Sequence, residues 1–253
     1  MSLVENKIKP LAPLKANTNN QKAYLKKLRG QRHDILFAVG PAGTGKTYMA
    51  VRDAIEKFQR GDITKIVITR PNVSTGDDLG YLPGSLTEKM APWTRPIIDV
   101  FMEAYSAHEV QRMIQSEEIE IAPLAYMRGR TFKNALIIAD EMQNATPEQM
   151  KMLMTRIGEN SRMIITGDTE QFDRRELGTE SGLADITRRL AARSAQQGEL
   201  PGFITDGRDP AAYAPINQRW ERIGIVNLGR DDVVRHPVIE EVLDLYDDVE
   251  MAA

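Results

Sequence analysis

Residues 40–47 read Gly40-Pro41-Ala42-Gly43-Thr44-Gly45-Lys46-Thr47, which matches the pattern G-x-x-x-x-G-K-[ST] of a phosphate-binding loop. An apolar run at 35–39 precedes the loop, and apolar residues at helical spacing follow it, as this motif requires. Glycines let backbone N–H groups close around phosphate oxygens, and the start of a helix adds positive dipole. We therefore expect the eight loop residues, and Tyr48 after them, to bind a nucleotide.

Two side chains of the loop have individual roles in this motif. Lys46 is expected to reach the β- and γ-phosphates, and the hydroxyl of Thr47 is expected to ligate Mg²⁺. The competing interpretation is a glycine-rich turn that caps an ordinary strand–helix unit. The correct flanking segments favour the phosphate loop.

Composition limits the other possibilities. The chain has 253 residues, of which 42% are hydrophobic and 27% charged, and its net charge is −3. Binding of nucleic acid would therefore depend on a local basic patch. Cysteine is absent, which excludes disulfides, thiolate metal sites and cysteine nucleophiles and fits a reducing cytoplasm. The sequence shows no signal peptide and no long apolar run, so we expect a soluble cytoplasmic protein without membrane contact.

Strand-like and helical segments alternate along the chain. Apolar runs predict strands at 35–39, 65–69, 135–139 and 163–166, and apolar residues interrupted by polar ones predict strands at 118–122 and 222–228. Helical patterns fall at 18–29, from 47 to Gly61, from Thr146 to Gly158, at 182–193 and at 237–246, with capping signatures at Ser85 and Ser106. This order predicts an α/β fold with a doubly wound, mostly parallel sheet and helices on both faces.

The domain organisation is expected to be simple. Residues 1–16 lack a clear period and predict an N-terminal arm, and residues 17–253 predict a single domain. Within it, 71–130 predicts an irregular excursion, because 71–96 is rich in proline and glycine. Residues 194–220 predict a long polar loop.

The strand predicted at 135–139 ends in Asp140-Glu141, which is typical of a Walker B motif. Asp140 is expected to hold Mg²⁺ through water, and Glu141 to orient and polarise the attacking water as general base. The pair argues against a small-molecule kinase, which has no need to activate water. An Asp-Glu pair that opens a solvated turn is the alternative.

A further strand end carries an amide. The strand at 163–166 is followed by Gly167-Asp168-Thr169-Glu170-Gln171. Because strand ends at the carboxyl edge of such a sheet face the nucleotide, Gln171 is expected to bond the γ-phosphate and the lytic water. A plain surface turn is the alternative.

Several motifs occur together in an order that resembles the PhoH family of P-loop ATPases. These are the loop at 40–47, Thr-Arg-Pro (69–71), Leu-Gly-Tyr-Leu-Pro-Gly (79–84), Ala-Tyr-Met-Arg-Gly-Arg-Thr (125–131), Asp-Glu-Met-Gln-Asn (140–144), Gly-Asp-Thr-Glu-Gln (167–171) and Asp-Val-Val-Arg-His-Pro (232–237). The resemblance implies a RecA-like fold similar to the first motor domain of superfamily-1 helicases, Mg²⁺-dependent ATP hydrolysis and association with RNA. It also implies that Gln21 reads adenine. The version at 168–173 resembles phage-borne members, in which case the protein would act in the cytoplasm of a host.

Candidate nucleic-acid contacts follow the second predicted strand. Arg70 lies at the edge where helicases contact the nucleic-acid backbone, and Trp93 and Tyr81 are candidates for stacking bases. Arg128 and Arg130 add local positive charge. We expect single-stranded RNA as the partner, with DNA as the other candidate. The alternatives are packing for the aromatic residues and a structural or solvated role for Arg70.

Only one motor core fits in this length, whereas two-domain helicases receive an arginine finger from a second core. We therefore expect a homo-oligomer, such as a ring or hexamer, with Arg130 and Arg235 as candidate fingers. Arg130 is favoured because the excursion could reach a neighbour, whereas the family resemblance implies that Arg235 senses the γ-phosphate in its own subunit. Ion pairs within the fold are the alternative for both arginines. A second function class also stays open: a nucleotide-dependent switch of assembly or partner binding that does not involve nucleic acid.

Overall fold

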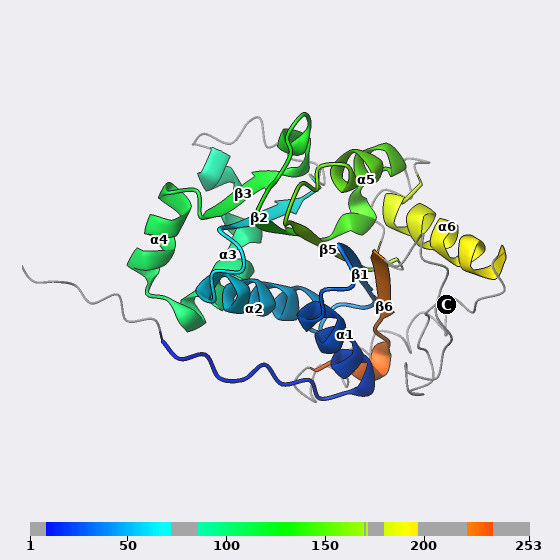
Figure 1. Ribbon diagram of the computed structural model, residues 1–253, viewed down its shortest axis with the longest axis horizontal. Coiled ribbons are helices and arrows are strands. Elements are labelled where there is room, and N and C mark those ends of the chain that lie inside the picture. The colour runs from blue at the N-terminus through cyan, green and yellow to red at the C-terminus, as the bar shows by residue number, and fades with distance from the viewer. Residues whose placement is uncertain (1–8, 72–85, 170, 172–179, 197–221, 235–253) are drawn as a thin grey trace, which may run out of the picture.

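The fold is built on six parallel strands. The computed structural model describes residues 9–71, 86–169, 171, 180–196 and 222–234. The strands are β1 (Ile35–Val39), β2 (Lys65–Arg70), β3 (Ile119–Pro123), β4 (Ala135–Ala139), β5 (Arg162–Gly167) and β6 (Ile223–Asn227), in the order β3-β2-β4-β5-β1-β6. The chain passes from β1 to β2 across the positions that β4 and β5 fill later (Figure 1). This confirms the predicted doubly wound sheet.

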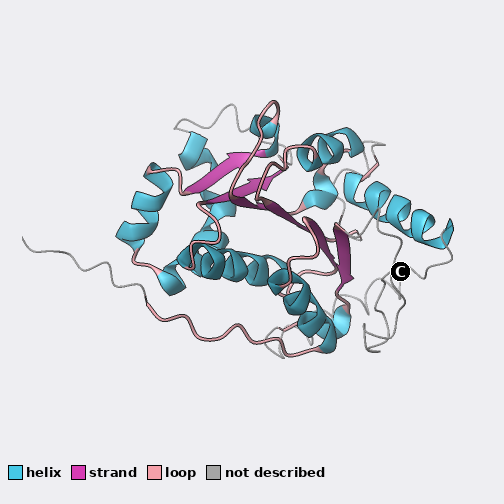
Figure 2. Cartoon of the chain, in the orientation of Figure 1, coloured by secondary structure: helices cyan, strands magenta, loops and turns pink. Residues whose placement is uncertain are grey.

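Helices cover both faces of the sheet, as predicted (Figure 2). One face carries α1 (Asn19–Arg29), α2 (Lys46–Gln59), α3 (Leu86–Ala104) and α4 (Ala107–Gln115), and the other carries α5 (Pro147–Met154) and α6 (Gly182–Gln196). Three short 3₁₀ turns complete the described elements: η1 (Leu124–Met127), η2 (Met142–Asn144) and η5 (Arg230–Asp232). None of the described helices is long and apolar enough to cross a membrane.

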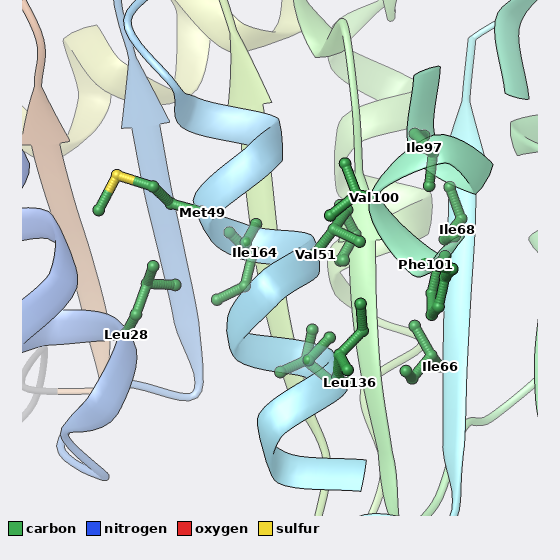
Figure 3. Packing of buried hydrophobic residues seen from close by; sticks show 14 of the residues in the cluster. Leu28, Met49, Val51, Ile66, Ile68, Ile97, Val100, Phe101, Leu136 and Ile164 are labelled. Carbon is green, nitrogen blue, oxygen red and sulfur yellow. The ribbon is translucent and has the colours of Figure 1, made fainter. Parts of the chain in front are cut away.

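The alternation of side chains along the strands divides the core into two clusters. In β4, Leu136 and Ile138 pack with the helices of the α2 face, whereas Ile137 packs with those of the α5 face. Figure 3 shows the first cluster, where Val51 of α2 and Phe101 of α3 lie over the sheet. All five residues of β4 are buried, which explains its continuous apolar sequence.

Helix α3 differs from the irregular excursion predicted for 71–130. Within the described residues it runs from Leu86 to Ala104 through Pro92 and Pro96, and the capping signature predicted at Ser85 lies outside them. Prolines in a helix interior cost about 3 kcal/mol or more. Burial of the apolar face that includes Ile97 and Phe101 offsets this cost through tertiary packing, which local sequence patterns do not report.

Helix α5 begins as predicted but ends earlier than Gly158. Thr146 caps it, and the backbone N–H of Thr146 donates to Gln149 Oε1 at 3.0 Å. After Met154 the chain turns towards Phe132, whose backbone N–H donates to Arg156 O at 3.0 Å. A Cβ at position 158 would lie 2.4 Å from Phe132 O, so the glycine serves this close approach and not the helix end.

The described part of the N-terminal arm lies along the helices of the α2 face (Figure 1). Lys9 N donates to Ala104 O at 2.9 Å, and Leu14 is buried in the core cluster. The predicted polar loop at 194–220 begins with the last turn of α6, and 197–220 lies outside the described residues. The closing helix predicted at 237–246 lies outside them as well.

Candidate nucleotide-binding site

The loop at 40–47 joins β1 to α2 and has the backbone of a phosphate cradle. Gly43 and Gly45 both adopt a φ of 84°, in the left-handed region that glycine tolerates, and Gly45 is the N-cap of α2. The hydroxyl of Thr44 donates to Pro41 O at 2.9 Å and closes the loop from inside. A helix that starts without a side-chain cap leaves backbone N–H groups at its first turn, and these suit phosphate oxygens.

Lys46 projects over this loop. Its ammonium donates to Gly40 O at 2.5 Å and to Pro41 O at 2.7 Å. Its backbone carbonyl accepts a hydrogen bond from the hydroxyl of Tyr24 of α1 at 3.1 Å. Burial raises the pKa of Tyr24 well above its usual value, so the phenol stays a donor at neutral pH.

The candidate metal ligands meet at the end of β4. Thr47 Oγ1 and Thr166 Oγ1 each donate to Asp140 Oδ1 at 2.6 Å. Asp140 is only 8% exposed, and its backbone N–H donates to Thr69 O at 2.9 Å. One carboxylate beside one hydroxyl is the donor set that Mg²⁺ takes when phosphates and waters supply its other ligands. The described residues hold no cluster of three or more His, Asp or Glu side chains that would suit a cage built from protein alone.

Glu141 stands in a special backbone conformation. Its φ is 53°, in the left-handed region that is uncommon for residues other than glycine. Gln143 Nε2 donates to Glu141 Oε2 at 2.5 Å, and Gln143 Oε1 accepts from Asp168 N at 3.1 Å. The buried Gln143 amide therefore orients the carboxylate and ties it to the end of β5.

Gln21 is near the loop but fully engaged within the chain. Its Nε2 donates to Thr44 O at 3.3 Å and to Asp232 O at 3.0 Å, and its Oε1 accepts from Asn17 N at 2.8 Å and from Thr18 N at 3.4 Å. The side-chain amide of glutamine has two donor hydrogens and two acceptor lone pairs, so its capacity is filled. Its expected role in reading adenine stays a prediction.

A cavity of about 470 Å³ joins most of these groups. Its wall includes the loop from Ala42 to Tyr48 except the buried Thr44, together with Asp140, Glu141 and Gly167 at the strand ends. Lys15 and Asn17 of the arm, Gln21, Met49 and Val234 complete the lining. The structure thus brings together the loop, the acidic pair and Gln21, as the sequence predicts. Gln171 is described and exposed, but it does not line this cavity, and its role stays a prediction.

The candidate nucleic-acid residues divide into two kinds. Arg70 ends β2, is half-buried, and its guanidinium has no hydrogen bond or ion pair within the described ranges. Trp93 is half-buried and packs against the core cluster, which agrees with packing as the alternative to base stacking. Tyr81 lies outside the described residues.

The two candidate finger residues also differ. Arg130 forms a two-pronged ion pair with Glu120, in which Nη2 donates to Oε2 at 2.8 Å, and its Cζ lies 4.7 Å from the centre of the Phe132 ring. This pair lowers the pKa of the Glu120 carboxyl below its ordinary value, and it agrees with the ion-pair alternative. Arg235 lies outside the described residues.

Three further residues contact the site, and the sequence patterns assign no role to them. Gln143 and Thr166 contact Glu141 and Asp140, and Asp232 accepts hydrogen bonds from the side chains of Thr18 and Asn20. Gln143 lies within the motif at 140–144 and Thr166 directly precedes the motif at 167–171, so a buried polar side chain at or just after a strand end is a usable signal. Asp232 opens the motif at 232–237, but its partners lie more than 200 positions away in the sequence, so the motif does not reveal these contacts.

Comparisons with known proteins agree on one family. The family model described as PhoH-like protein matches residues 13–205. The chain is 42% identical over 234 residues to the PhoH-like protein of Bacillus subtilis (strain 168), with 92% of this chain and 64% of that protein covered. It is 40% identical over 210 residues to Protein PhoH of Escherichia coli (strain K12), with 82% and 57% covered. The chain therefore spans about three fifths of the length of these relatives.

Among solved structures, the Pif1 helicase from Candida albicans aligns with a TM-score of 0.41 at 13% identity, over 93% of this chain and 44% of that one. A TM-score at this level carries no conclusion about function.

Proposed function

The chain belongs to the PhoH-like protein family, and from that premise we propose that it is a Mg²⁺-dependent ATP hydrolase. The observation that carries the proposal is the 2.6 Å hydrogen bond between Thr47 and Asp140, which joins the phosphate loop to the acidic pair. A nucleotide-binding loop alone is compatible with many reactions. The loop with a metal-binding hydroxyl, a carboxylate and an oriented second carboxylate favours hydrolysis.

Each group has a definite part in this reaction. The loop N–H groups and Lys46 bind the phosphates, while Thr47 and Asp140 would hold Mg²⁺, which supplies neutralising charge for the phosphates. Glu141, positioned by Gln143, takes a proton from the attacking water as the water oxygen bonds to the γ-phosphorus. The bond from the γ-phosphorus to the bridging oxygen breaks, and ADP and phosphate leave. Gln171 is proposed to contact the γ-phosphate and the water.

Two variants test this assignment. Lys46→Ala is expected to lose productive ATP binding, because the loop loses its cation. Glu141→Gln is expected to bind ATP normally and to hydrolyse it about 100-fold more slowly or worse, the scale of general-base catalysis. Binding is measured by equilibrium titration and hydrolysis by phosphate release. Normal turnover by folded Glu141→Gln protein would overturn the role of Glu141.

We further propose that single-stranded RNA stimulates the hydrolysis, with single-stranded DNA as the other candidate. The support is local: Arg70 directly follows Thr69, whose carbonyl is bonded to the backbone of Asp140. An RNA phosphate that binds Arg70 would therefore be coupled, through the backbone of Thr69, to the strand end that carries Asp140. The test is the ATPase rate with and without RNA at low salt. Absence of any RNA effect would favour the switch function instead.

We also propose that a second copy of the chain completes the site with an arginine, in a ring-like homo-oligomer. The support is chemical: a cation that approaches the γ-phosphate stabilises the charge that develops there. Native mass spectrometry with and without ATP tests this proposal. A monomer with full ATPase activity would overturn it.

A further inference from the structure

Some residues that line the nucleotide cavity have no proposed role in binding phosphate or metal. Lys15 and Asn17 of the N-terminal arm and Tyr48 of α2 line the cavity, and none of them is hydrogen-bonded to the acidic pair among the contacts of the described residues. A nucleoside triphosphate whose phosphates lie on the loop must place its base against some other part of the wall. The identity of these residues therefore decides which bases the site accepts.

The arm is fixed in place as part of this wall. The buried guanidinium of Arg52 donates to Ala12 O, and Leu14 inserts into the core cluster two residues further on. The backbone N–H of Asn17 donates to Gln21 at 2.8 Å. The arm thus contributes a formed surface, while the side chains of Lys15 and Asn17 stay exposed to solvent.

Tyr48 contributes the aromatic side chain in the lining of the cavity. It is 39% exposed, although Arg52 Nη1 donates to its hydroxyl at 2.8 Å and the hydroxyl lies 3.2 Å from Glu103 Oε2. The Cζ atom of Arg52 lies 5.7 Å from the ring centre. These contacts hold the ring in one orientation. Stacking on an aromatic ring tolerates every base, because every base has a π-face.

Gln21, the buried amide in the lining of the cavity, is not available to read a base edge. Both of its donors and both of its acceptors are used by Thr44, Asp232, Asn17 and Thr18. Strong selection by hydrogen bonding requires a buried polar group that the wrong ligand leaves unpaired. Here the amide of Gln21 is already hydrogen-bonded within the protein. A base other than adenine therefore leaves no buried polar group without a partner.

We infer that this site takes nucleoside triphosphates of all four bases, held by their phosphates and by stacking on Tyr48, with Gln21 as a positioning residue for the loop. The inference rests on the proposed function and extends its substrate from ATP to nucleoside triphosphates as a class. Exposed Lys15 and Asn17 supply no more than a weak preference, because water pairs them equally well when the base does not.

A binding panel tests the inference independently of hydrolysis. A fluorescent N-methylanthraniloyl derivative of ATP is displaced from the full chain by ATP, GTP, CTP or UTP in the presence of Mg²⁺. The four Kd values are expected to lie within about 10-fold of one another. This spread is smaller than the roughly 100-fold discrimination between ligands that pocket shape alone can give. A preference for ATP above about 100-fold would overturn the inference. Phosphate release is measured in parallel, and its absence alongside base-tolerant binding would count against hydrolysis only.

Two sets of variants separate the roles of the residues. Tyr48→Ala is expected to weaken the binding of all four nucleotides by a similar factor, about 5- to 100-fold for a lost stacking contact. Tyr48→Phe, which keeps the ring and the Arg52 guanidinium over it, is expected to keep most of the affinity. Inorganic triphosphate, which has no base, is expected to bind both variants equally. Equal weakening of inorganic triphosphate and nucleotides by Tyr48→Ala would refute stacking.

Gln21→Ala distinguishes a positioning residue from a base reader. We expect a lower melting temperature and an unchanged ratio of the Kd values for ATP and CTP, because the loop loses a support that serves all nucleotides alike. A selective loss of ATP affinity in Gln21→Ala would show that Gln21 reads adenine and would overturn the inference.

Discussion

The side-chain amide of Gln143 donates to the carboxylate of Glu141 at 2.5 Å and accepts from the backbone N–H of Asp168 at 3.1 Å. One buried side chain thus links the ends of β4 and β5 through the residue proposed as general base. The approach is close, because a Cβ at Gly167 would lie 2.7 Å from Gln143 Oε1. Glycine at this position therefore makes room for the link.

Replacement of Gln143 is expected to slow hydrolysis more than it weakens binding. Gln143→Leu keeps the volume but removes both hydrogen bonds, so Glu141 loses its orientation. We expect kcat to fall about 10- to 100-fold, the cost of a misplaced catalytic group, with little change in the Kd of ATP. Gln149→Leu is the control, because Gln149 caps α5 and lies outside the cavity. Equal kcat values for the two variants would contradict the positioning role.

The hydroxyl of Thr47 is expected to decide the response to Mg²⁺. Thr47→Ser keeps the oxygen, whereas Thr47→Val keeps the shape and removes it. We expect near-normal hydrolysis for the serine variant and a loss of about 100-fold for the valine variant, with a higher Mg²⁺ concentration needed for half-maximal rate. The measurement is the rate across a Mg²⁺ titration. A valine variant that titrates like the wild type would exclude Thr47 as a ligand.

The phosphate loop and the strands were predictable because their signals are local. A run of five apolar residues before Asp140 predicts a fully buried parallel strand, and the structure confirms it. Thr146, Pro147 and Gln149 likewise predict the start of α5, since a capping box acts within one turn. Such features need no knowledge of the rest of the chain.

Features that depend on distant partners were not predictable. Pro92 and Pro96 favour a broken segment, and only the packing of α3 on the core explains a continuous helix there. Gln21 is bonded to Asp232, 211 positions later, so its sequence context cannot show that its amide is already engaged. The pairing of Arg130 with Glu120 also crosses from a loop to a strand, and the sequence left it open as an alternative.

Arg70 is expected to bind the nucleic-acid backbone. Arg70→Ala should weaken RNA binding and reduce the slope of log Kd against log salt by about one phosphate contact, while basal ATPase stays nearly intact. Arg70→Lys keeps the charge and should keep the slope. Arg60→Ala serves as a control, because Arg60 lies beyond α2 and pairs with Asp62 at 2.9 Å. An unchanged salt slope in Arg70→Ala would remove Arg70 from the interface.

The ion pair of Arg130 and Glu120 is expected to stabilise the fold in a pH-dependent way. Arg130→Ala should lower the free energy of unfolding by about 1 kcal/mol at most, because the arginine side chain is 37% exposed and solvent screens the pair. The pair lowers the pKa of Glu120 from 4.5 in the folded state, so its contribution is complete above that pH and is lost as the pH falls through the lower folded pKa. The difference between wild type and variant in urea unfolding should therefore shrink in acid, and a difference that grows there would contradict the pairing.

The same variant decides whether Arg130 also acts as a finger in a neighbouring subunit. Because its guanidinium already serves Glu120 and packs over Phe132, we expect Arg130→Ala to hydrolyse ATP at a rate near that of the wild type. The finger role requires the opposite: a folded but nearly inactive variant, since a lost finger costs about 1,000-fold or more. Mixing then gives an independent check, because Lys46→Ala subunits lack a working site but keep Arg130. Recovery of activity when the two inactive proteins exchange subunits would establish the finger, and full activity of Arg130→Ala alone would exclude it.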